Sequence, residues 1–251
     1  MVAKTGQISV LSGLAVAVCL ELIGWQVSRI YWLAGLLVIV FWLFVWLFLA
    51  RRDWPYKIMV WLIPTINFLA WCGFLTIVNS QPLRQLFIAV AAICQWWYWH
   101  YGWPVWLDDC QPVSWWRLVN AINLVTIWLL AAVLYGWQSF LAWPIFWPWL
   151  LWLILSGLII WSDYHASSLA LKKHWPIVVA NWLIGGQLFL VVYFLPSSHF
   201  VLAYLLLVAY YLASQVGRTS LLKINTVRRL RYQFLVLIVG LLLVLLTAKW
   251  L

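Results

Sequence analysis

The stretch IYWLAGLLVIVFWLFVWLFLA, residues 30–50, contains no charged side chain, and residues 36–42 are apolar at every position. An α-helix rises 1.5 Å per residue, so about 20 such residues cross the roughly 30 Å hydrocarbon core of a bilayer. A strand of a transmembrane barrel would instead alternate apolar and polar residues over about ten positions. The unbroken run therefore favours a membrane-spanning helix.

The rest of the chain has the same character. Of its 251 residues, 67% are hydrophobic and 8% are charged, and the mean hydropathy is +1.00. A soluble domain of this length could not cover so much apolar surface, so lipid must be the solvent for most of it. The sequence predicts an all-α, polytopic transmembrane helical bundle that forms one integral membrane domain over residues 1–251. Nine segments are long enough to cross, at approximately residues 8–27, 30–50, 56–78, 84–106, 116–138, 144–162, 175–195, 199–216 and 231–250.

Basic residues predict the orientation, because short cytoplasmic loops are enriched in Lys and Arg. With a cytoplasmic N-terminus, nine crossings leave only Arg29, Arg84 and Lys249 of the 15 basic residues outside. We therefore expect the C-terminus to lie outside. The short loops favour the inner (plasma) membrane of a prokaryote. The twelve basic residues expected inside are Lys4, Arg51, Arg52, Lys57, Arg117, Lys172, Lys173, Arg218, Lys223, Arg228, Arg229 and Arg231.

The net charge of +10 has a simple explanation in this topology. The basic residues lie at loop ends beside lipid, so we expect anionic headgroups at the cytoplasmic face, and no nucleic acid, as their partners. Residues 217–231 form the longest basic loop. This loop is predicted to be a basic stop-transfer flank of a membrane-spanning helix, a short interfacial helix, or a docking site for an acidic cytoplasmic partner.

Cysteine and histidine patterns predict no cofactor. The cysteines Cys19, Cys72, Cys94 and Cys110 form no CxxC pair, so we expect free thiols. Haem ligation needs facing histidines within a bundle. Because His199, like the two histidines of the cytoplasmic rim described below, lies at a predicted helix end, haem is not expected.

The 24 tryptophans exceed what the two membrane interfaces require. Six of them lie well inside predicted spans, where each indole N–H needs an acceptor: Trp42, Trp46, Trp71, Trp128, Trp152 and Trp182. Packing between helices and an aromatic cage for a flat or cationic ligand both explain them. Prolines at positions 64 and 104 predict kinks that free helical carbonyls and could make room for a cavity.

Polar residues within the predicted spans fall into two layers. Helical rise places Glu21, Asn67 and Gln187 at one depth, and His100, Asn123 and Asn181 nearer the cytoplasm. An intramembrane carboxylate must be protonated, partnered or solvated. These six residues are therefore predicted either to bond the helices together or to form a pathway for protons or a small solute.

The predicted cytoplasmic rim offers the ingredients of an enzyme. Its carboxylates and imidazoles could hold a divalent metal beside basic side chains that bind a lipid phosphate. Their spacing matches no diagnostic metal-binding pattern, and aspartates among so many basic residues are more often loop anchors. The candidate residues are Asp108, Asp109, Asp163, His165 and His174.

Several features together favour a function without catalysis. The chain shows no internal repeat, and an odd number of spans does not divide into matched transporter halves. We expect a membrane subunit or scaffold of a larger assembly, with membrane proteins as partners, or a binder of a small hydrophobic ligand. The first alternative is a small-solute or proton-coupled transporter or channel around Glu21. The second is a lipid-phosphate enzyme at the cytoplasmic rim.

Overall fold

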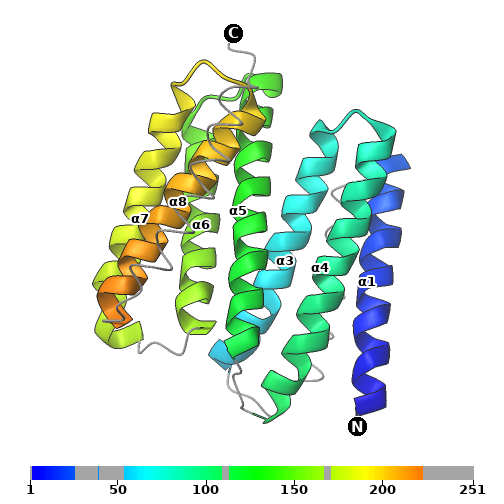
Figure 1. Ribbon diagram of the computed structural model, residues 1–251. Coiled ribbons are helices and arrows are strands. Elements are labelled where there is room, and N and C mark those ends of the chain that lie inside the picture. The colour runs from blue at the N-terminus through cyan, green and yellow to red at the C-terminus, as the bar shows by residue number, and fades with distance from the viewer. Residues whose placement is uncertain (1, 26–38, 40–53, 109–112, 167–170, 223–251) are drawn as a thin grey trace. The chain divides into compact units, whose positions relative to one another are not determined.

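The computed structural model describes residues 2–25, 39, 54–108, 113–166 and 171–222 (Figure 1). All regular structure in these ranges is helical, which confirms the all-α prediction for this part of the chain. The predicted span 231–250, and the span 30–50 apart from Ile39, lie outside the described residues. The helices are α1 (Val2–Trp25), α3 (Trp54–Ile77), α4 (Gln81–Asp108), α5 (Val113–Leu141), α6 (Phe146–Ala166), α7 (Leu171–Tyr193) and α8 (His199–Leu222).

These seven helices coincide with seven of the predicted segments. The last of them, α8, runs to Leu222 rather than ending at residue 216, so the beginning of the predicted basic loop is helical. A helix can extend beyond its membrane-crossing segment, because backbone hydrogen bonds continue past the point where side chains become too polar for lipid. Within the described residues, three helical stretches are long and apolar enough to cross a membrane, namely Arg117–Leu141, Phe146–Asp163 and Trp175–Tyr193.

In the turn between α3 and α4, the backbone groups at the two helix ends find hydrogen-bond partners within the protein. The Arg84 guanidinium donates to the Val78 carbonyl at 3.2 Å, just beyond the last residue of α3. The Arg84 backbone N–H donates to the Ser80 carbonyl at 2.9 Å, which begins α4. Since helix ends leave carbonyls and N–H groups without partners, one arginine stabilises both sides of this turn.

The chain divides into two compact units, and the first covers residues 1–126. Within it α1 packs mainly against α4. A Cβ atom on Gly13 would lie 3.0 Å from the Ala92 carbonyl oxygen, so glycine permits this close approach. The α3 and α4 helices meet through aromatic rings. Phe74 of α3 has its ring centroid 4.9 Å from that of Phe87 and 6.2 Å from that of Trp71.

The second unit covers residues 127–251, and α7 contacts both α6 and α8 within it. Its core contains a stack of three aromatic rings. Phe189 of α7 lies 4.5 Å from Tyr135 of α5 and 5.3 Å from Trp152 of α6, with interplanar angles of 9° and 21°. All three side chains are buried. This stack joins three helices at one level of the unit.

Candidate functional site

Asn67 lies in a buried hydrogen-bond chain that links three helices of the first unit. Gln95 Nε2 of α4 donates to Asn67 Oδ1 of α3 at 3.3 Å. Asn67 Nδ2 then donates to Thr126 Oγ1 of α5 at 2.8 Å. Thr126 Oγ1 in turn donates to the Ile122 carbonyl at 2.8 Å. The amide and hydroxyl groups are therefore used to bond helices together, as the structural interpretation of the polar layers expects.

Sequence reasoning missed two members of this group, Thr126 and Gln95, and of the two Gln95 makes more hydrogen bonds to another helix. Its amide also donates to the Pro64 carbonyl at 3.0 Å, and it is 1% exposed. The Gln95 Oε1 atom and the Thr65 hydroxyl are buried without a hydrogen-bond partner in the part of the chain described. The sequence did offer one signal, because Gln95 lies five residues before His100 on the same predicted helix and therefore points in a different direction. At 100° per residue, two side chains so spaced point about 140° apart, so both cannot face the same interior.

The other predicted residues of the first unit lie in different environments. Glu21 of α1 is half-buried, whereas Asn123 of α5 is 2% exposed. His100 of α4 is exposed, and its ring stacks on Trp96 with centroids 5.4 Å apart. Tyr101 contacts the same imidazole edge-on at 5.2 Å. The structure therefore buries two of the predicted residues in this unit, Asn67 and Asn123, and leaves His100 on its surface.

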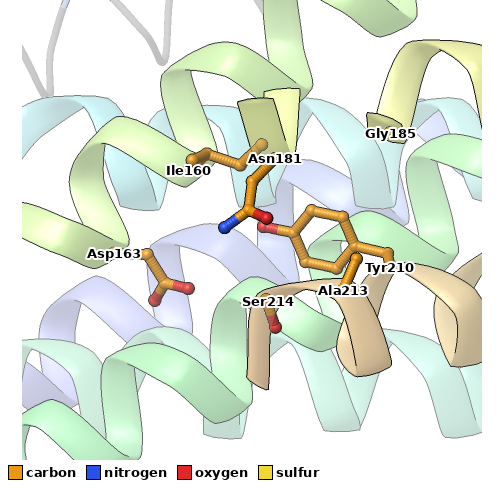
Figure 2. A pocket seen from close by; sticks show the side chains of 7 residues that line it. All are labelled: Ile160, Asp163, Asn181, Gly185, Tyr210, Ala213 and Ser214. Carbon is orange, nitrogen blue, oxygen red and sulfur yellow. The ribbon is translucent and has the colours of Figure 1, made fainter. Parts of the chain in front are cut away.

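In the second unit, Asn181 lines a small cavity between α6, α7 and α8 with room for about one water molecule. Figure 2 shows its amide between the Asp163 carboxylate and the Tyr210 hydroxyl. Asp163 and Asn181 are 3% and 7% exposed. The Ser214 hydroxyl, which also lines the cavity, donates to the Tyr211 carbonyl at 2.8 Å. The cavity joins one residue of the predicted rim with one of the predicted polar layers.

Gln187 of α7 is exposed. The preceding residues Gly185 and Gly186 are buried against neighbouring helices. Because side chains on a helix turn by 100° per residue, the buried glycine face places Gln187 on another side. The prediction that it shares an interior with Asn181 concerned depth alone and did not fix the direction of the side chain.

Three of the remaining residues of the predicted rim lie at helix ends. Asp108 lies at the end of α4, His165 in the last turn of α6 and His174 in the first turn of α7. Their side chains are not described, and Asp109 lies outside the described residues. Among the residues that are described, no group of three His, Cys, Asp or Glu side chains could hold a metal ion.

Three tryptophans of α6 and α7, of which Trp152 is buried and Trp149 and Trp182 are half-buried, donate hydrogen bonds to the backbone of the opposite helix. Trp152 Nε1 donates to the Gly185 carbonyl at 3.0 Å, and Trp149 Nε1 donates to the Gly186 carbonyl at 3.2 Å. In the other direction, Trp182 Nε1 donates to the Leu153 carbonyl at 2.6 Å. These contacts identify the acceptors that Trp152 and Trp182 were expected to need. In the first unit Trp71 Nε1 is buried without such a partner among the described residues.

Cys19, Cys72 and Cys94 are free thiols, as predicted, and Cys110 lies outside the described residues. Cys72 is buried in α3, and the other two are half-buried.

Comparison of this chain with protein-family models, with curated proteins and with solved structures gave no significant match.

Proposed function

We propose that this chain is a subunit or scaffold of a larger membrane assembly and performs no chemistry of its own. We also propose nine crossings in the inner (plasma) membrane of a prokaryote, with a cytoplasmic N-terminus and an external C-terminus. The distribution of Lys and Arg along the sequence supports this topology. The three long apolar helices support a location in a membrane.

The observation that carries the proposal is the exposed amide of Gln187. It lies within the apolar stretch Trp175–Tyr193, about 18 Å along the helix from Trp175 and about 9 Å from Tyr193. A lipid chain offers this amide no hydrogen bond, whereas another transmembrane helix can. A protein neighbour is therefore favoured over lipid at this position. His100, exposed within the predicted span 84–106, has the same need.

Several buried polar groups support the same proposal, because they already have hydrogen-bond partners within the chain. Asn67, Gln95 and Thr126 are already joined by hydrogen bonds within the first unit. A pathway for a solute needs polar groups that can exchange partners with it, whereas these donors are used between helices. In the second unit, the indoles of Trp152 and Trp182 bond to backbone carbonyls, which favours packing over an open aromatic cage.

A photo-crosslinking amino acid placed at residue 187 tests this proposal in native membranes. We expect it to capture a protein, identified by mass spectrometry after irradiation. Ile154 of α6, which is 52% exposed and surrounded by apolar residues, provides the matched position for contact with lipid. The same reagent there is expected to give lipid adducts. Lipid adducts alone at both positions would contradict the proposal.

A second candidate function is movement of a proton or small solute, and the cavity at Asp163 and Asn181 favours it. A buried carboxylate beside an amide and hydroxyl groups is suited to exchange a proton. Purified protein in vesicles that contain a pH-sensitive dye tests this function. Transport requires a proton flux that Asp163→Asn abolishes and Gln187→Leu preserves. No flux in the unsubstituted protein would exclude proton movement by this chain alone.

A further inference from the structure

The outward side of α7 forms a regular stripe along the helix. Ala180, Ile184, Gln187 and Val191 are all exposed, and their spacing of four, three and four residues places them on one face. Of the three long apolar stretches found among the described residues, that of α7 has the smallest share of buried residues. In α7, 22% of the residues of this apolar stretch are buried, against 39% in α6 and 67% in α5.

We propose that this stripe is the contact between two copies of the chain, related by a twofold axis along the membrane normal. This inference rests on the proposed role in assembly and names the partner at one surface. All copies in a membrane have the same orientation, so Gln187 of one copy lies at the same depth as Gln187 of its partner. An amide both donates and accepts a hydrogen bond, so two such amides satisfy each other.

The residues around Gln187 fit a close pairing of parallel helices. No Lys, Arg, Asp or Glu occurs between residues 175 and 195, so two copies meet without charge repulsion. Ala180 is small enough to let two backbones approach near one end of the stripe. Ile184 and Val191 flank the amide by one turn on each side and supply apolar contact. A single polar residue within such a seam aligns the two helices, as it does in coiled coils.

Disulfide cross-linking between differently tagged copies tests the pairing. In a full-length chain whose four cysteines are replaced by alanine, single cysteines are introduced as Ile184→Cys and Val191→Cys. Ile154→Cys on α6 is the control, because that side chain is exposed but lies on another helix. After oxidation in native membranes, we expect cross-linked pairs carrying both tags at positions 184 and 191, and few at 154.

Substitution of Gln187 then tests the hydrogen bond itself. Gln187→Leu is expected to weaken association about fivefold, while Gln187→Asn retains most of it. Association is measured by energy transfer between labelled copies as the lipid-to-protein ratio is raised. Because Gln187 is exposed, both variants should fold, which their elution as a single species checks.

Two results would overturn the pairing of copies: equal cross-linking at position 154, or capture of a different protein at positions 184 and 191. The last result would leave the broader role in assembly intact. Retention of full association in Gln187→Leu would also contradict the inference. Lipid contact alone at residue 187 would remove both this inference and the proposed function.

Discussion

The α3–α4–α5 contact and the α6–α7 contact satisfy buried polar groups in two different ways. In the first, amide and hydroxyl side chains bond to one another, from Gln95 through Asn67 to Thr126, as well as to backbone carbonyls. In the second, Trp152 and Trp182 donate directly to backbone carbonyls across the interface. The first contact depends on each partner being present, whereas the second depends on how closely two backbones approach. The two regions should therefore fail differently when they are altered.

The largest expected effect is in the α6–α7 contact. Trp152→Ala removes a fully buried ring that stacks on Phe189, so we expect a loss of about 3 kcal/mol of stability. Trp152→Phe keeps an aromatic ring against Phe189 but removes the N–H and part of the indole, so we expect a smaller loss of about 2 kcal/mol. Unfolding of the purified protein in mixed detergent micelles measures both values. Trp147→Ala, on the exposed side of α6, is the control and should change stability by less than about 0.5 kcal/mol. Equal losses for Trp152→Ala and Trp147→Ala would show that the stack does not stabilise the unit.

The next effect tests the polar chain of the first unit. Asn67→Leu removes the partner of both Gln95 and Thr126, so we expect a loss of about 2 kcal/mol. Combining it with Gln95→Leu should cost less than the sum of the single substitutions, because the two share a bond. Gln85→Leu, at an exposed position of α4, is the matched control. Strict additivity in this double-mutant cycle would argue against the chain of hydrogen bonds.

A smaller effect distinguishes two glycines at the α6–α7 contact. A Cβ atom on Gly157 would lie 2.9 Å from Trp182 Nε1, so Gly157→Ala must displace a ring that is already bonded. We expect a loss of about 1 kcal/mol in the same unfolding measurement. At Gly185 the nearest atom, Tyr210 Cδ2, would be 4.0 Å away, so alanine there should be tolerated. Destabilisation by both substitutions to the same degree would contradict this account of the close approach.

The smallest expected change in stability is at Ala142, which belongs to neither of the two contacts. Ala142 follows the last residue of α5 with φ of 50°, a left-handed conformation that glycine adopts without a Cβ penalty. Ala142→Gly should therefore stabilise the protein by about 0.5 to 1 kcal/mol. Ala142→Val is expected to act in the opposite direction, and a stabilising valine would rule out the left-handed conformation.

The sequence predicted the helices well because a run of apolar residues long enough to cross a bilayer can hardly be anything else. Counting residues along each helix also gives an expected depth for each polar side chain, because helical rise is constant. Asn67 and Gln187 were accordingly assigned to one layer. Depth does not determine the direction of a side chain, because a small rotation of a helix changes which residues face inward. Asn67 proved to be buried and Gln187 exposed.

Contacts with backbone carbonyls were the least accessible to prediction. Every residue has a carbonyl, so no pattern of letters marks Gly185 or Leu153 as an acceptor for a tryptophan. The nearest signal was the pair Gly185 and Gly186, which indicated close helix approach without naming the indoles that use it. Gln95 was missed because helical rise gives the level of its amide along α4 but does not show that it faces α3.

The most direct test of the central claim is native mass spectrometry of the chain extracted gently from its own membranes. The account predicts that it emerges with protein companions in a fixed stoichiometry, either further copies or other membrane proteins. A single bare chain that carries only lipid, under conditions that preserve known membrane complexes from the same preparation, would contradict it.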